Sequence, residues 1–118
     1  MKMDLQVHTK TGSDGNWPVE DVFKEAKRRN IQLLSITDHD SIDAQARAIA
    51  LSRDYGISYI TGVELNVTFE YPSNEGKSTK SHSLDFLGYQ YDMENQELKN
   101  KLQLMRKHRE ARARKILE

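Results

Sequence analysis

The stretch Leu33–Asp40, which reads Leu-Leu-Ser-Ile-Thr-Asp-His-Asp, begins as a short apolar run and ends in three ionisable residues. In an α/β chain, such a run after a helix is typical of a buried parallel strand. Residues just past the C-terminal end of such a strand lie where barrels and open sheets carry their active sites. We therefore expect His39 to lie at the mouth of a site rather than in a core.

The segments around this strand predict alternating strands and helices, and hence an α/β fold. Pro18 is typical of a first helical residue, and Gly56 is typical of a helix end. In the second helix, Ile42, Ala46, Ile49 and Ala50 have the spacing of an inward-facing stripe. Strands are expected over residues 3–8, 31–37, 57–64 and 81–91, helices over 18–30, 41–55 and 95–118, an extended ribbon over 65–71, and a polar loop over 72–80.

Candidate metal ligands follow or end successive strands. His8 ends the first strand, His39 follows the second and Glu64 ends the third. Further candidates are Gln6, which shares a strand face with His8, then Asp14 in the first loop, and either His82 or Asp85 on the fourth strand. Because nitrogen and oxygen donors of this mixture suit Zn, Mn or Fe, the sequence indicates a metal site with one or more such ions.

Composition indicates one modest globular domain of 118 residues. There is no cysteine, which excludes disulfides and thiolate metal sites. No apolar run approaches the roughly 20 residues that span a membrane, so we expect a cytoplasmic protein. Residues 1–98 carry 10 Lys and Arg against 16 Asp and Glu, whereas residues 99–118 carry 8 against 2. The acidic body favours metal ions, and the basic tail favours either an acidic partner or a plainly solvated helix.

The motifs, in their order along the chain, resemble the polymerase and histidinol phosphatase (PHP) family. These proteins are metal-dependent phosphoesterases with a distorted (β/α)7 barrel. The matching motifs are Asp-Leu-Gln-Val-His-Thr at Asp4–Thr9, Ser-Asp-Gly at Ser13–Gly15, Thr-Asp-His-Asp at Thr37–Asp40, Gly-Val-Glu at Gly62–Glu64, and Asp-Phe-Leu-Gly-Tyr at Asp85–Tyr89.

This resemblance implies up to three divalent metal ions, Mn, Zn or Fe. It implies that His8 ligates the first metal, that Glu64 bridges the first and second, and that Asp14 and His39 hold the third. His8, His39 and Glu64 would be the catalytic core. The implied reaction is hydrolysis of a phosphomonoester, or of a small nucleotide or oligonucleotide phosphate ester, by metal-activated hydroxide.

Two residues depart from the family pattern. Gln6 replaces the first histidine of a His-x-His pair, and Asp85 stands where the family has a histidine on the second metal. Strand alternation puts His82 on the face opposite Asp85, which favours Asp85 as the ligand. The departures also leave open a degenerate, non-catalytic PHP-type metal-binding or interaction module.

Length is the other departure, because a complete barrel needs on the order of 200 residues. The family's later ligands, a His and a closing Asp-x-His, have no counterpart here. We therefore expect residues 1–94 to form the N-terminal part of the barrel and residues 95–118 a basic helix that leads toward a missing or inserted segment. An uncovered half-barrel predicts association with the missing C-terminal half or with a second copy.

Overall fold

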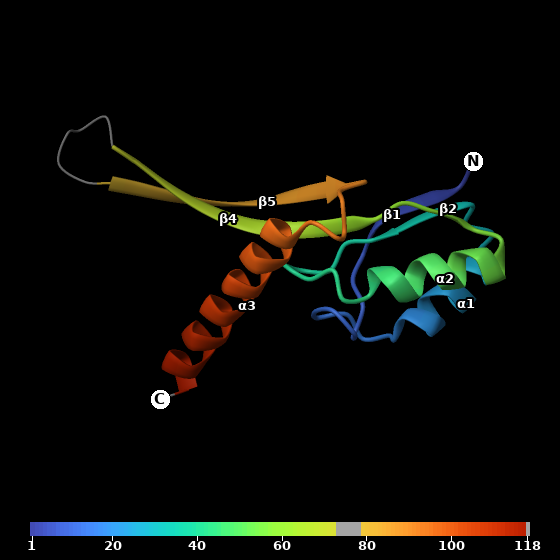
Figure 1. Cartoon of the computed structure of the whole chain (residues 1–118), viewed down its shortest axis with the longest axis horizontal. Coiled ribbons are helices and arrows are strands. Elements are labelled where there is room, and N and C mark those ends of the chain that lie inside the picture. The colour runs from blue at the N-terminus through green and yellow to red at the C-terminus, as the bar shows by residue number, and fades with distance from the viewer. Residues whose placement is uncertain (73–78, 118) are drawn as a thin grey trace.

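A computed structural model describes residues 1–72 and 79–117. Its centre is a small parallel sheet with strand order β1-β2-β3, and a separate antiparallel hairpin, β4–β5, extends away from it (Figure 1). Two helices, α1 and α2, lie side by side on one face of the sheet, and α3 descends from the base of the hairpin (Figure 1). The elements are β1 (Met3–Val7), α1 (Val19–Arg28), β2 (Leu33–Ile36), α2 (Gln45–Tyr55), β3 (Ser58–Tyr59), β4 (Gly62–Pro72), β5 (Thr79–Tyr89) and α3 (Gln96–Leu117).

The core lies between the parallel sheet and the two helices. As its spacing predicts, α1 buries one stripe: Val19, Val22, Phe23 and Ala26. Three of the four residues of β2 are buried, which confirms the strand at the start of the Thr-Asp-His-Asp motif. The fold is thus the α/β arrangement expected for part of a barrel, in which parallel strands alternate with helices that cover one side.

The inward face of α2 differs from the prediction. Ala46 and Ala50 are exposed, and the buried residues are Ala44, Gln45, Ala48, Leu51 and Ser52. The helix begins at Gln45 rather than Ser41, and within it Gln45 and Ala48 are buried where the prediction places Ala46 and Ile49. Because this stripe includes a polar glutamine, hydrophobic periodicity alone selected the wrong face.

The predicted third strand, residues 57–64, is divided between two elements. β3 is two residues long and pairs in parallel with β2, whereas Gly62–Glu64 opens β4. His39 and Glu64 form a parallel bridge, in which Asp40 N–H donates to the Glu64 carbonyl at 2.9 Å and Glu64 N–H to the Asp38 carbonyl at 3.1 Å. The start of β4 therefore runs beside the segment that follows β2.

The remainder of β4 pairs with β5 in an antiparallel hairpin that runs from Gly62↔Tyr89 to Pro72↔Thr79. The ribbon predicted at 65–71 is confirmed as part of β4, and the predicted fourth strand, 81–91, lies largely in β5. Most of the predicted polar loop, residues 73–78, lies outside the described residues. The Tyr89 hydroxyl donates to the Leu5 carbonyl at 2.6 Å, which joins the base of the hairpin to β1.

The predicted C-terminal helix is α3, and Asn95 caps its N-terminus, since the Asn95 side chain accepts from Leu98 N–H at 2.9 Å. Leu102 is its buried residue, whereas Leu104 is 66% exposed. Arg106 pairs with Asp43 and Arg109 with Asp40, each at 2.8 Å. These ion pairs fasten α3 to the segment that follows β2.

None of the described helices has the length and apolar character needed to span a membrane.

The Gln45 side chain joins β2 to β4 from inside the core. Its amide Nε2 donates to the carbonyl oxygens of Ile36, at 2.9 Å, and Gly62, at 3.0 Å. Its Oε1 accepts from the Tyr59 hydroxyl at 2.6 Å and from Gly62 N–H at 3.3 Å. Burial raises the pKa of Tyr59 above its ordinary value, so this hydroxyl stays protonated and can donate.

We expect Gln45→Met to lower the free energy of unfolding by roughly 2–4 kcal/mol, because the Ile36 carbonyl and the Gly62 N–H lose their Gln45 partner, whereas the Gly62 carbonyl keeps the Tyr91 hydroxyl as a donor. Urea unfolding followed by circular dichroism measures the loss. Gln103→Met on the exposed surface of α3 is the matched control, with an expected change within about 0.5 kcal/mol. Equal effects of the two substitutions would contradict the role given to Gln45.

Candidate metal centre

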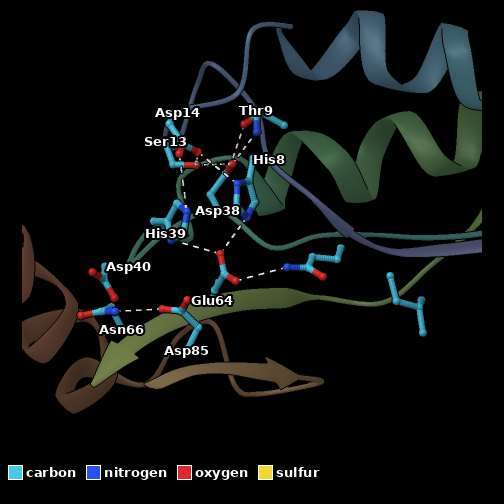
Figure 2. A network of polar contacts seen from close by, with 12 residues as sticks. His8, Thr9, Ser13, Asp14, Asp38, His39, Asp40, Glu64, Asn66 and Asp85 are labelled. Atoms are coloured by element: carbon cyan, nitrogen blue, oxygen red, sulfur yellow. Dashed lines mark hydrogen bonds and ion pairs between the residues drawn. The ribbon is translucent and has the colours of Figure 1, made fainter. Parts of the chain in front are cut away.

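Three strands bring candidate ligands to one edge of the sheet. His8 directly follows β1, His39 lies three residues past β2, and Glu64 is the third residue of β4, bridged to His39. Figure 2 shows the two imidazoles above Glu64, with Asp14 on their far side. His8 and His39 thus follow parallel strands of the sheet, Asp14 comes from the loop after β1, and Glu64 joins them at the start of β4 through its bridge to His39. We call His8, Asp14, His39 and Glu64 the His–carboxylate cluster.

The first loop is held in place by the fully buried carboxylate of Asp38. Asp38 Oδ1 accepts from Thr9 N–H at 2.5 Å and from the Ser13 hydroxyl at 2.9 Å, and Oδ2 accepts from the Thr9 hydroxyl at 2.7 Å. Gly12 completes the loop, because a Cβ there would collide with the Asp38 carboxylate. His8 and Asp14 flank this loop segment, so Asp38 positions both of them next to His39.

Within the cluster, each imidazole lies between two carboxylates. Glu64 Oε2 is 2.8 Å from His8 Nε2 and 3.0 Å from His39 Nδ1. On the other side, Asp14 Oδ1 is 3.0 Å from His8 Nδ1, and Asp14 Oδ2 is 3.6 Å from His39 Nε2. The two rings meet edge to face, with centroids 4.3 Å apart.

The geometry around Glu64 fits a bound cation. Three buried atoms have no partner in hydrogen-bond geometry: Glu64 Oε2, His8 Nε2 and His39 Nδ1. The oxygen lies only 2.8 and 3.0 Å from the two nitrogens, but these contacts do not have the angles of hydrogen bonds. Their lone pairs are therefore not satisfied by one another. Donors that each lie about 2.1 Å from one ion are about 3.4 Å apart in tetrahedral coordination and about 3 Å apart in octahedral coordination, so the spacings of 2.8 and 3.0 Å are closer to the octahedral value. Ligand atoms of His8, His39 and Asp14 also lie within 4.8 Å of one another.

Electrostatics keeps Asp14 ionised. Its slight burial raises the pKa of the carboxyl, but the imidazoles of His39 and His8 outweigh this and hold the pKa below its usual value. Asp14 is mostly exposed, so a cation from solvent can reach its carboxylate directly. The cluster thus offers anionic oxygen and imidazole nitrogen together, which is the donor set that Zn, Mn and Fe accept.

Gln6 lies beside the cluster, and its amide Nε2 donates to Glu64 Oε1 at 3.2 Å. This contact leaves Glu64 Oε2 directed at the two histidines. In the described geometry, Gln6 therefore orients a candidate ligand, whereas a histidine at this position would offer a nitrogen donor of its own.

The pairing of β4 with β5 places His82 and Asp85, the two candidate ligands on the fourth predicted strand, on opposite faces of the hairpin. Asp85 opposes Asn66, which places it on the same face as Glu64, and Asn66 Nδ2 donates to Asp85 Oδ1 at 2.9 Å (Figure 2). His82 opposes Phe69 on the other face, and its Nε2 is 2.7 Å from the Tyr71 hydroxyl. The structure thus brings Asp85 to the side of the hairpin that carries the cluster, but not His82.

Sequence reasoning did not foresee the parts played by Asp38, Gln45 and Asn66. Asp38 carried one usable signal, since an acidic residue that ends a buried strand needs several donors nearby. Gln45 and Asn66 carried none, because a buried amide and an exposed one look alike in a single sequence.

Comparison with known proteins adds a family to this geometry. The model of the family described as "PHP domain" matches residues 4–114. The chain belongs to the PHP domain family. It is 37% identical over 67 residues to a 3′,5′-nucleoside bisphosphate phosphatase of Chromobacterium violaceum, covering 57% of this chain and 23% of that protein. It is 28% identical over 112 residues to a 5′-3′ exoribonuclease of Haemophilus influenzae, covering 95% of this chain and 37% of that protein.

Solved structures share the fold. An amidohydrolase from Chromobacterium violaceum, with bound sulfate and no metal, has a TM-score of 0.82 and 31% identity, over 98% of this chain and 37% of that one. A protein from Bifidobacterium adolescentis has a TM-score of 0.78 at 23% identity, over 96% of this chain and 36% of that one. The chain spans less than half the length of the relatives it matches.

We expect Asp38→Asn to lower the free energy of unfolding by roughly 1–3 kcal/mol, because an amide accepts through one oxygen only and brings an unwanted donor. The Thr9 amide hydrogen should also exchange faster with solvent, since it loses its carboxylate acceptor. Urea unfolding and hydrogen exchange by NMR measure the two effects. Asp54→Asn, at an exposed position in α2, is the control, and a similar result there would rule out a special role for Asp38.

Proposed function

We propose that this chain supplies part of the active site of a metal-dependent phosphoesterase. The observation that carries the proposal is the convergence of Glu64 Oε2, His8 Nε2 and His39 Nδ1, three buried donor atoms that do not satisfy one another. Divalent cations bound at such a site polarise a phosphoryl oxygen and lower the pKa of bound water toward neutrality. Family membership and the order of the motifs along the chain support this reading.

The residues have distinct tasks in this proposal. The first cation is held by His8, His39 and Glu64. Asp14 lies next to the other ring nitrogen of each histidine and is a donor for a second cation. Asp85 lies on the same face of the hairpin as Glu64 and is the candidate on β5. Gln6 keeps Glu64 aligned through its amide. Mn, Zn and Fe all accept this donor set, and up to three ions fit the family pattern.

For the substrate, we propose a phosphate ester of a nucleotide or a short oligonucleotide. Two relatives point in this direction, since one is named a 3′,5′-nucleoside bisphosphate phosphatase and another a 5′-3′ exoribonuclease. Both names describe hydrolysis of a phosphate ester next to a ribose. Because those relatives are much longer than this chain, we also propose that a further part of the barrel, or a second copy, completes the site.

One observation favours a second candidate, a metal-binding module without catalysis. Gln6 stands where a ligating histidine is expected, and in the structure it donates to Glu64. A neutral amide is a weaker metal ligand than imidazole. Metal binding without hydrolysis would be the mark of this alternative.

We expect the chelator-treated protein to bind at least one equivalent of Mn²⁺ and then to hydrolyse p-nitrophenyl phosphate only weakly on its own, because a further part of the barrel or a second copy completes the site. His39→Ala should weaken Mn²⁺ binding at least tenfold and abolish most hydrolysis, because it removes a donor from the cluster. Isothermal titration calorimetry and phosphate release measure the two. His82→Ala, on the other face of the hairpin, is the control and should change neither. Failure of the wild-type protein to bind Mn²⁺ would overturn the proposal, whereas binding without hydrolysis would favour the module.

We expect Gln6→His to tighten Mn²⁺ binding severalfold, because it replaces an amide that only orients Glu64 with an imidazole donor on the same strand face as His8. Calorimetric titration measures the change. Gln32→His, at an exposed position away from the cluster, is the matched control with unchanged affinity expected. Weaker binding in Gln6→His than in the wild type would show that the Gln6–Glu64 hydrogen bond matters more than an added donor.

A further inference from the structure

Two arginines of α3 contact the turn that carries His39. Arg109 Nη2 lies 2.8 Å from Asp40 Oδ2 in an ion pair. Arg106, on the same side of the helix, donates from its Nη2 to the Ser41 hydroxyl at 3.0 Å. Asp40 and Ser41 directly follow His39 in the chain, and both are buried. The helix therefore contacts the two residues next to a member of the His–carboxylate cluster.

The Asp40 carboxylate depends on α3 for the compensation of its charge. An ionised carboxylate with little access to water is costly unless a cation or several donors lie against it. Asp40 is only 5% exposed, and its Oδ1 is buried without a hydrogen-bond partner. Within the described part of the chain, Arg109 is the cation that pairs with it. Removal of this guanidinium would leave a buried and uncompensated charge directly beside His39.

The backbone at Asp40 is in the left-handed region, with φ at 50°. A residue with a Cβ adopts this conformation at a cost, and it persists where contacts on several sides hold it. The Asp40 N–H donates to the Glu64 carbonyl at 2.9 Å, and the Asp40 side chain pairs with Arg109. The turn is thus held by β4 through its backbone and by α3 through its side chain. Figure 2 shows Asp40 between the cluster and α3.

His39 consequently lies between two buried carboxylates with different anchors. Asp38, on one side, is bound to the first loop by three hydrogen bonds. Asp40, on the other side, is bound to α3. The ligand atoms that gather within 4.8 Å of one another come from His8, Asp14 and His39, and Asp40 is not among them. Asp40 therefore acts on the site through the placement of His39 rather than as a ligand.

We propose that Arg109 is a positioning residue for the metal centre. Its ion pair with Asp40 holds the turn that directs His39 at Glu64, so that docking of α3 and binding of the cation stabilise each other. The proposal rests on the metal site proposed above and adds a means of regulating it, since displacement of α3 weakens cation binding. By thermodynamic linkage, the cation must strengthen the docking of α3 by the same factor.

Coulomb's law alone predicts the opposite effect of removing Arg109. A guanidinium repels a nearby divalent cation, and its loss would also leave the negative charge of Asp40 uncompensated. Both changes would tighten cation binding. Positioning through Asp40 predicts weaker binding instead. The sign of the change in the dissociation constant therefore distinguishes the two effects.

The test measures the Mn²⁺ dissociation constant of the chelator-treated protein by isothermal titration calorimetry. We expect Arg109→Gln to raise this constant about tenfold, a factor typical of coupled sites. Arg109→Lys keeps a positive charge opposite Asp40 and should stay within about threefold of the wild type. Arg112→Gln is the matched control, because Arg112 is an exposed arginine of α3 without an ion pair to a carboxylate among the described residues. Its constant should stay within about twofold of the wild type, since exposed charges are screened by solvent and salt.

Two further measurements separate positioning from a loss of folding. In the metal-free protein, Arg109→Gln should shift the NMR resonances of the His39 ring, whereas Arg112→Gln should not. In the wild type, saturating Mn²⁺ should slow hydrogen exchange of the α3 amides about tenfold, as linkage requires.

Unchanged or tighter Mn²⁺ binding in Arg109→Gln overturns the positioning role, and so does an equal loss in Arg112→Gln. Hydrogen exchange of α3 that does not respond to bound Mn²⁺ also overturns it, and this result needs no variant. Failure of the wild type to bind Mn²⁺ overturns the proposed metal site instead. In that case the His39 resonances decide the positioning role by themselves, because they are measured without metal.

Discussion

The buried carboxylate of Asp38 is the interaction on which the candidate site depends. An ionised carboxylate without contact to solvent is costly unless several donors surround it, and no cation pairs with Asp38 in the described part of the chain. All three of its side-chain hydrogen bonds come from the first loop. Thr9 follows His8, Ser13 precedes Asp14 and Asp38 precedes His39. One buried charge therefore sets the relative position of three members of the His–carboxylate cluster.

Glu64, the fourth member of the cluster, is positioned by a buried neutral side chain, that of Gln45. The amide of Gln45 holds the end of β2 and the start of β4 together, two residues before Glu64. Gly62 makes this close approach feasible, because a Cβ there would collide with the Ser35 hydroxyl and the Thr37 methyl group. The cluster is thus held from two directions by groups that are themselves buried and satisfied. Rigid support of this kind holds the ligand atoms close together.

Sequence patterns predicted the parts of the fold that periodicity controls. The α1 stripe, the buried β2 strand and the opposite facing of His82 and Asp85 all follow from the periods of a helix and a strand. The order of strands also predicts that His39 and Glu64 lie close together, although Glu64 lies at the start of β4 rather than at the end of the predicted third strand. The prediction of the inward face of α2 was wrong. The central residue of that face is Gln45, which stabilises the core through four hydrogen bonds rather than through buried apolar area.

The pairing of β4 and β5 was beyond sequence patterns for another reason. The sequence predicts residues 65–71 and 81–91 as separate extended segments, and nothing in their alternation distinguishes an antiparallel ribbon from two strands of a barrel. The choice depends on which neighbours are present to pair with. In the described chain, β5 pairs with β4 alone, and its Tyr89 hydroxyl joins the ribbon to β1.

Charge balance connects the cluster with α3. Because an imidazole binds a metal in its neutral form, the two carboxylates give the loaded cluster a ligand charge of −2, which one divalent cation neutralises. Each further cation needs additional anionic donors, and nearby acidic residues compete for that role. Asp40 forms an ion pair with Arg109, and Asp43 forms one with Arg106. Because both carboxylates are paired with α3, they are less available as metal ligands. Asp85, whose partner is the neutral amide of Asn66, keeps its negative charge available on the face that carries Glu64. The basic helix thereby selects which carboxylates of an acidic body remain open to metal.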